Sequence, residues 1–205
     1  FCRGCRASLI EPCLSCEKNH PVWEDVCGEC GASQQEERER ICEPLTNTLG
    51  ESLTLAHEHE YENALNLLSS VQQDQHPFTE DIRQQAAEQM ELITTQRDEQ
   101  YQLRDQLVEL ANQHQQALDY SAVVRELEKI PVPLRTGNEI AQQLSNAQQS
   151  QNDLSMLEKQ IRDAVFIEQF EGLLETTARF LELKPGDAKI LKLHEQLQQR
   201  QAKLD

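Results

Sequence analysis

Paired cysteines near the N-terminus constrain this chain more than any other feature of its sequence. Six of the seven cysteines in the 205 residues have Cys-x-x-Cys spacing. The three pairs are Cys2/Cys5, Cys13/Cys16 and Cys27/Cys30. A disulfide framework would distribute cross-links through a fold, whereas two thiols in one Cys-x-x-Cys pair share a tight turn, as a tetrahedral metal requires. The spacing therefore predicts metal binding, with a disulfide or redox role of the same thiols as the alternative.

The second and third pairs together have the spacing of a single four-cysteine zinc site. Ten residues separate Cys16 from Cys27, which is enough for a short hairpin between two metal-binding knuckles. We expect the thiolates of Cys13, Cys16, Cys27 and Cys30 to bind one Zn²⁺. Four thiolates leave no coordination position for water, so we expect this zinc to be structural rather than catalytic.

The residues between these pairs indicate how the site would be built. We expect positive φ angles at Gly28 and Gly31, in the sharp turn of the second knuckle. Val22, Trp23 and Val26 are the sizeable apolar residues of this segment, and we expect them to cover the metal. A segment this small cannot fold on hydrophobic burial alone, so metal binding would supply about 10 kcal/mol or more of the folding free energy.

Two further residues could bind a metal or react, but we expect both of them to have structural roles. His20 lies between the pairs, and with four cysteines present we expect it to be a turn residue rather than a ligand. Cys42 has no neighbouring base in the sequence, so we expect it to behave as a small buried residue.

The segments FCRGCRASL and CLSC…VCGECG resemble the bacterial double zinc ribbon over residues 1–33. That family joins four Cys-x-x-Cys knuckles and uses them two by two, and the segment from Phe1 to Leu9 looks like the closing half of a first ribbon. Three alternatives stay open for Cys2 and Cys5: no metal, a metal shared with another chain, or a partner pair outside this sequence. Because the chain begins at Phe1 rather than Met, we expect it to be part of a longer protein.

The acidic character of the chain disfavours nucleic acid as a partner. The formal net charge is −17, and residues 1–33 carry three basic residues against five acidic ones. A zinc ion with four thiolates adds about two more negative charges. Zinc ribbons that bind nucleic acid usually present a basic patch, so a nucleic-acid-associated ribbon protein is kept only as the alternative function.

The composition changes after Gly31 in a way that predicts helices. Residues 34–205 are rich in Gln, Glu, Leu and Ala, which favour helices, and they contain no convincing strand pattern. We therefore expect a mainly α fold with two domains. A zinc ribbon would occupy residues 1–33, and an elongated α-helical repeat region of antiparallel hairpins would occupy residues 34–205.

Three segments of the helical region share one pattern: 59–71, 118–130 and 168–180. Each has an aromatic residue, an apolar residue ten positions later, a proline and then an isoleucine. The aligned residues are Tyr61, Tyr120 and Phe170; Val71, Ile130 and Phe180; Pro77, Pro133 and Pro185; and Ile82, Ile140 and Ile190. This register predicts one structural unit used three times.

The unit resembles the tetratricopeptide repeat, in which an aromatic residue lies at the turn between two antiparallel helices and a proline ends the unit. The closest match is FLELKPGDAKIL at 180–191, where we expect Asp187 to cap the following helix. The aromatics are 59 and 50 residues apart, compared with about 34 in that family. The first helix of each later unit must therefore be longer than usual.

The long helices carry a narrow apolar stripe. One is expected from about Thr79 to Leu118, with Leu107 and Leu110 on its stripe, and the next carries apolar residues from Ile140 to Val165. Such a stripe is typical of a coiled-coil seam and needs a partner helix. The partner would come from this chain or from a second copy, which leaves a homodimer open.

The order of the expected segments, a zinc ribbon followed by helical repeats, resembles the regulatory portion of large multidomain proteins of planctomycete bacteria. The segments that carry this resemblance are PVWEDVCGECG, EYENAL and LELKPGD. Those proteins couple such segments to Ser/Thr kinase or formylglycine-generating-enzyme-like domains, which implies that any catalysis lies outside these residues. The sequence also lacks a Walker motif, a dinucleotide-binding loop, a His-Glu-x-x-His motif and a nucleophile elbow.

These observations predict a non-catalytic zinc-binding scaffold or regulatory module that binds a protein partner or a tethered domain. No stretch approaches the roughly 18 consecutive apolar residues of a membrane span. No signal peptide is visible either, so we expect a cytoplasmic protein.

Overall fold

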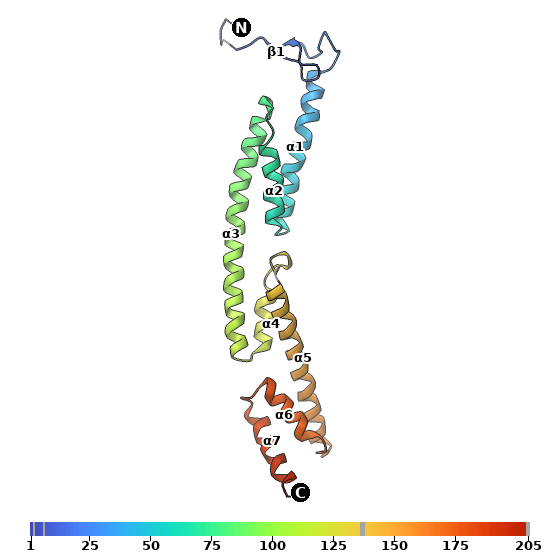
Figure 1. The fold of residues 1–205 in the computed structure, drawn as a ribbon, viewed down its shortest axis with the longest axis vertical. Coiled ribbons are helices and arrows are strands. Elements are labelled where there is room, and N and C mark those ends of the chain that lie inside the picture. The colour runs from blue at the N-terminus through green and yellow to red at the C-terminus, as the bar shows by residue number, and fades with distance from the viewer. Residues whose placement is uncertain (2, 6, 136–137, 204–205) are drawn as a thin grey trace. The chain divides into compact units, whose positions relative to one another are not determined.

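The computed structural model describes residues 1–205 except residues 2, 6, 136–137 and 204–205. It is mainly α-helical, with 72% of the chain in helices. A small β-hairpin with four clustered cysteines comes first, and antiparallel helices that pack in sequence order follow it (Figure 1). The expected fold class is therefore confirmed.

The elements follow one another with short connections. Two strands form the N-terminal hairpin: β1 (Ile10–Pro12) and β2 (Asn19–Pro21). The longer helices are α1 (Gln34–His57), α2 (Tyr61–Gln72), α3 (Glu80–Gln116), α4 (Tyr120–Glu128), α5 (Asn138–Phe166), α6 (Leu173–Leu183) and α7 (Ala188–Gln201). Two short 3₁₀ helices, η1 (Pro77–Thr79) and η2 (Val132–Arg135), precede α3 and α5.

Contacts within the chain divide it into two compact units, Phe1–Glu99 and Gln100–Asp205. The helix α3 begins in the first unit and ends in the second. The domain boundary between residues 33 and 34 stays a prediction, because this division into units does not test it.

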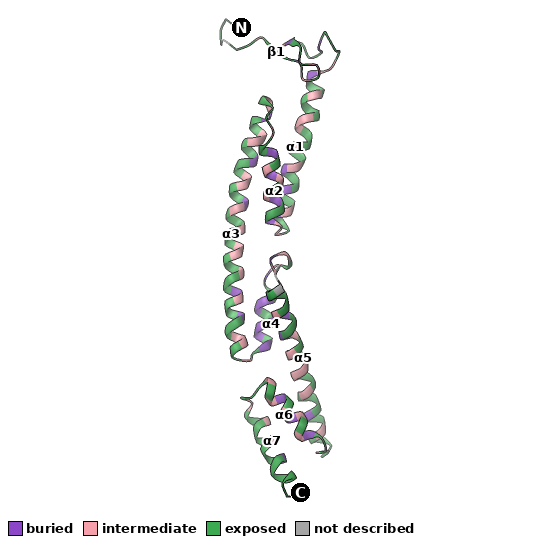
Figure 2. Cartoon of the chain, viewed as in Figure 1, coloured by how far each residue is buried: buried purple, intermediate pink, exposed green. Residues whose placement is uncertain are grey.

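In the first unit, α1 and α2 pack against each other. Figure 2 shows the buried positions along the inner face of α2 in purple. They are spaced three or four residues apart, as expected for one helix face: Tyr61, Ala64, Leu68 and Val71. The helix α3 is tied to this pair by the Ser52 hydroxyl, which donates to the Gln89 side chain at 3.4 Å, and by an ion pair between Arg97 and Glu62.

In the second unit, α4 packs on α5, α5 on α6 and α6 on α7. The last three helices share a core that contains Ile161, Leu173, Phe180 and Leu197. The helix α7 begins as expected, because the Asp187 carboxylate accepts hydrogen bonds from the N–H groups of the second and third helical residues at 3.1 and 3.2 Å.

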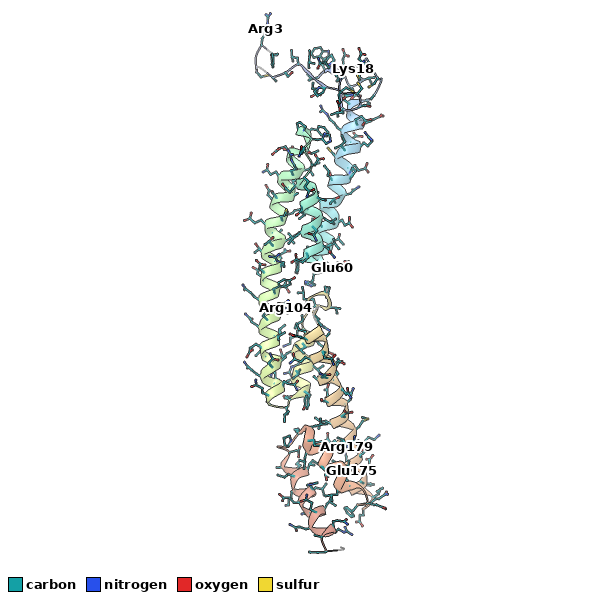
Figure 3. All side chains as sticks on the ribbon, in the orientation of Figure 1. Arg3, Lys18, Glu60, Arg104, Glu175 and Arg179 are labelled. Carbon is teal, nitrogen blue, oxygen red and sulfur yellow. The ribbon has the colours of Figure 1, made fainter. Side chains whose placement is uncertain are left out.

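Three helices of the chain, α1, α3 and α5, end in the same way. A non-glycine residue takes a left-handed conformation at each end, with φ of 63° at His59, 58° at Leu118 and 56° at Glu168. The next N–H group then donates to the carbonyl five residues earlier, at 2.8, 2.9 and 2.9 Å, which is the Schellman arrangement. Glu60, labelled in Figure 3, is the donor at the first of these turns.

The aromatic residues that align in the sequence all lie one position after these donors. Tyr61 and Tyr120 are buried and begin α2 and α4, while Phe170 is half-buried shortly before α6. The residues ten positions later, Val71, Ile130 and Phe180, are all buried as well. Membership of the tetratricopeptide family stays a prediction.

Two members of the expected apolar stripes face solvent instead. Leu110 on α3 and Val165 on α5 are 43% and 42% exposed, whereas Leu107 and Ala111 on α3 are buried. The buried part of each stripe is therefore narrower than the full set of its apolar residues. A helix that packs on one side buries only the positions that point directly at its neighbour.

Candidate metal centre

The four cysteines of the second and third pairs converge on one point. Cys13 Sγ lies 3.6 Å from Cys30 Sγ, and Cys16 Sγ lies 3.9 Å from Cys27 Sγ. All four sulfur atoms lie within 4.8 Å of one another. A tetrahedral Zn²⁺ with bonds of about 2.3 Å to sulfur needs sulfur atoms about 3.8 Å apart, whereas a disulfide bond is about 2.0 Å long. The cluster could therefore hold a metal ion such as zinc, and its thiols are free.

The two knuckles have matching backbone geometry. The N–H group of Glu17 donates to the carbonyl of Cys13 at 2.8 Å, and Gly31 donates to Cys27 at the same distance. The N–H group of each first cysteine also donates to the carbonyl five residues later, at 2.8 and 2.9 Å. Each pair is thus held in a tight turn that directs both thiols to the same side.

The left-handed position of each knuckle comes directly after its second cysteine. Glu17 has φ of 61° and Gly31 has φ of 76°. The expectation for Gly31 is therefore confirmed, but the expectation for Gly28 is wrong, because its φ is not positive. The residues between the two cysteines form an ordinary turn, and the chain needs the left-handed conformation only to leave it.

The cluster is buried on one side and open on the other. Cys13 and Cys27, the first cysteine of each pair, are only 1% and 2% exposed. Cys16 is half-buried and Cys30 is exposed. A metal held here would thus be shielded by the hairpin on the side of the first cysteines and approachable beside Cys30.

Gln34, the first residue of α1, contacts the cluster directly. Its Nε2 donates to Cys13 Sγ at 3.3 Å and to the carbonyl of Ala32 at 3.2 Å. Its Oε1 accepts a hydrogen bond from the N–H group of Leu14 at 2.9 Å. This buried amide therefore joins the first helix to both knuckles.

Hydrogen bonds favour the ionised form of the Cys13 thiol. Burial alone would raise its pKa, but the N–H groups of Cys16 and Ser15, the Gln34 amide and the Cys16 thiol all stabilise the thiolate. Together they lower the pKa of Cys13 to about 6. The Cys13 thiol therefore ionises more readily than an ordinary cysteine thiol.

The opposite holds for Cys16. The backbone at Lys18 lowers the pKa of its thiol, but burial and the sulfur atoms of Cys30, Cys13 and Cys27 outweigh that effect. The pKa of Cys16 rises to about 12. Four thiols this close cannot all ionise unless a cation replaces their protons, which is the chemistry that a divalent metal supplies.

The cluster is braced by contacts on the hairpin surface and at the start of α1. Lys18, labelled in Figure 3, forms an ion pair with Glu29 across the two knuckles at 2.8 Å. The Asp25 carboxylate accepts hydrogen bonds from the hydroxyl of Ser33 and from the N–H group of Gln35, both at 2.9 Å. These contacts hold the segment between the pairs against the first turn of α1.

The predicted apolar cover over the metal is not formed. Val22, Trp23 and Val26 are 44%, 67% and 53% exposed. The expectation for these residues is wrong because the polar Gln34 side chain, rather than an apolar one, fills the space beside Cys13.

Two other expectations for single residues also need correction. His20 lies in β2 rather than in a turn, and it is 1% exposed, with no hydrogen-bond partner for its Nδ1. It is not part of the four-cysteine cluster. Cys42 is half-buried rather than buried, because it lies in the part of α1 between Gln34 and Leu49, where no residue is buried.

The first cysteine pair is not brought to the cluster in the described part of the chain. Cys5 is free and exposed. Cys2 lies outside the described residues, so the alternatives for this pair stay predictions.

The sequence did not reveal the importance of Gln34, and it did not indicate that His20 would be buried in a strand. Both are polar residues in polar surroundings, so no pattern distinguished them from solvent-exposed neighbours. The position of Gln34 directly after the serine that caps α1 is the only available signal, because a residue at a helix start can face the preceding segment.

Among the described residues, no helix combines the length and apolar character needed to cross a membrane. No known protein family, curated protein or solved structure matches this chain.

Proposed function

We propose that this chain is a non-catalytic scaffold or regulatory module, in which a structural Zn²⁺ holds the N-terminal hairpin on a set of helices that bind a protein partner. The observation that carries the proposal is the convergence of four thiols with the spacing of tetrahedral zinc. Zinc would replace the thiol protons and join the two knuckles. It would contribute folding free energy that so small a hairpin cannot obtain from apolar burial.

The ligand set supports a structural role for the metal. Four thiolates complete a tetrahedral shell, so no position remains for a substrate or an activated water. The hydrogen bond from the Gln34 amide to Cys13 supports the same role, because it joins one candidate ligand to the first turn of α1. Metal binding would thereby orient the hairpin relative to the helix that follows it.

The helical part supports a role in protein binding. The chain has a formal net charge of −17, so its series of antiparallel helices offers acidic surfaces to basic partners and repels phosphates. We propose that the three similar helix ends mark tetratricopeptide-like units and that the hairpin belongs to the zinc ribbons. Free thiolates also require a reducing compartment, which favours the cytoplasm.

Cobalt substitution tests the proposed metal site. Protein prepared with Co²⁺ in place of zinc is expected to show the intense visible absorption of a tetrahedral thiolate complex, and one equivalent of Zn²⁺ should abolish it. Weak absorption typical of an octahedral ion would contradict the proposal. The Cys42→Ser variant is the matched control, because it removes a thiol that lies outside the cluster.

A further inference from the structure

A groove lies between the hairpin and the first turns of α1. It has a volume of about 380 Å³ and lies within the first unit. Its walls come from both strands, from the segment after β2 and from α1. The lining residues that matter chemically are Glu11, His20, Trp23, Glu24, Arg38 and Glu39.

The buried side of the groove contains an unsatisfied polar group. His20 is 1% exposed, and its Nδ1 is the one buried side-chain nitrogen or oxygen without a hydrogen-bond partner in the part of the chain that the structure describes. Leaving such a group unpaired costs about 1–3 kcal/mol. A ligand group that reaches this nitrogen would remove that cost, so His20 points to an occupant of the groove.

Glu11, the residue opposite His20 in the hairpin, already forms an ion pair with Arg38. Glu11 faces His20 across the two strands, and its carboxylate accepts a hydrogen bond from the Arg38 guanidinium at 2.8 Å. Arg38 also lies over the ring of Phe78, with 5.9 Å between its Cζ and the ring centroid. This arrangement shows that a guanidinium fits between the hairpin and α1 when a carboxylate is present.

The open side of the groove has two carboxylates, those of Glu24 and Glu39, that form no ion pair among the described residues. No ion pair or hydrogen bond to the carboxylate of Glu24 exists among the described residues, and Glu39 is bonded only to a neutral amide, at 2.9 Å. Trp23 beside them is 67% exposed. An exposed indole next to carboxylates binds cations well, since the ring face attracts positive charge and the carboxylates add to the attraction.

We propose that this groove binds an arginine side chain in a basic segment of a protein partner. The guanidinium stacks on Trp23 and donates to the carboxylates of Glu24 and Glu39. Its planar fork has five N–H donors, so one remains for His20 Nδ1 when the neutral imidazole carries its proton on Nε2. The proposal rests on the proposed scaffold function and names the chemistry of its partner.

Trp23 itself reports the binding, because it is the single tryptophan of the chain. The probe is a Gly/Ser peptide with a central Arg-Ser-Arg, titrated into the zinc-loaded protein while tryptophan fluorescence is recorded. We expect a saturable change. The matched peptide with citrulline in place of arginine keeps the shape but loses the charge, and it should bind at least tenfold more weakly.

Variants of the protein locate the site. Trp23→Ala should weaken binding by about threefold to tenfold when it is measured with a fluorescent label on the peptide. Glu24→Gln should weaken it by up to about fivefold. The matched control Glu51→Gln, an exposed acid on α1 outside the groove, should leave the affinity unchanged. In ¹⁵N NMR spectra, the Nδ1 resonance of His20 should shift when the arginine peptide binds.

Each outcome supports or overturns a separate step. Equal affinity for the arginine and citrulline peptides, or no saturable change with zinc-loaded folded protein, would overturn the groove and leave the metal site standing. Arginine-dependent binding that neither Trp23→Ala nor Glu24→Gln weakens would place the partner surface elsewhere and overturn the groove as well. Absence of zinc from the purified protein would overturn both the scaffold function and the inference that rests on it.

Discussion

The amide of Gln34 donates a hydrogen bond to the sulfur of Cys13 at 3.3 Å. A single side chain thereby connects the first turn of α1 to the four-cysteine cluster, and it also bonds to the backbone of both knuckles. If the cluster holds zinc, the affinity for the metal and the stability of the helix start must depend on each other.

Replacement of this amide gives the first prediction. Gln34→Ala should lower zinc affinity about 10-fold or more, as is typical when a hydrogen-bond partner of a metal ligand is removed. A competition titration against a chromophoric chelator measures the effect. Gln35→Ala is the matched control, because that neighbouring side chain is exposed and its amide donates a hydrogen bond to Glu39 rather than to the cluster. Equal loss in both variants would show that the amide–thiolate contact does not matter.

Removal of one thiol gives the second prediction. Cys30→Ser should abolish tight zinc binding and unfold the hairpin, while the helices of the second unit keep their structure. Hydrogen exchange would then show lost protection in β1, β2 and the first turn of α1. Cys42→Ser should change neither the zinc content nor this protection. Retention of tight zinc binding by Cys30→Ser would count against a four-cysteine site.

The cap of α4 gives the third prediction. The Asp119 carboxylate accepts a hydrogen bond from the N–H group of Ala122 at 3.1 Å. Asp119→Ala should lower the free energy of unfolding by about 1 kcal/mol, whereas Asp119→Asn should cost little at neutral pH because asparagine caps equally well. Chemical denaturation at pH 7 measures both changes, and an equal loss in the two variants would contradict the capping role.

The same carboxylate predicts a pH dependence. The hydroxyl of Ser121 and the N–H group of Ala122 hold the pKa of Asp119 below its ordinary value. Because the folded-state pKa is depressed, its stabilisation is fully present above the unfolded-state pKa, about 3.9, and is lost as pH falls through the lower folded-state value. Asp119→Asn should therefore flatten the acid loss of stability, and the exposed Asp163→Asn should not.

Two leucines in the second unit give the fifth prediction. Leu127 on α4 is fully buried, while Leu110 on α3 is 43% exposed. Leu127→Ala should cost about 2–5 kcal/mol of unfolding free energy, and Leu110→Ala should stay within about 0.5 kcal/mol. Thermal and urea denaturation measure both values. A large cost at Leu110 would mean that its side chain is covered, for example by a second copy of the chain.

The cysteine cluster could be predicted from the sequence because it depends on local geometry. Two residues between cysteines place both thiols on one turn, and ten residues between Cys16 and Cys27 allow the turns to meet. The helices could be predicted for a similar reason, since composition and the spacing of apolar residues act over a few turns.

The surroundings of the cluster could not be predicted because they depend on how α1 packs against the hairpin. That packing buries the polar Gln34 and His20 and leaves Trp23 in solvent, which reverses the usual preference of these residue types. The left-handed conformations of His59 and Leu118 at the helix ends could not be predicted either, because a non-glycine residue in this conformation leaves no mark in the sequence.

The zinc content of native protein, purified without chelators and measured by elemental mass spectrometry, tests the central claim most directly. The mass in solution is measured on the same sample, so the ratio of metal to chain is unambiguous. We predict at least one tightly bound zinc ion per chain, lost when Cys13→Ser or Cys27→Ser is introduced. A protein that folds with its hairpin intact and contains no zinc or other metal would contradict the account.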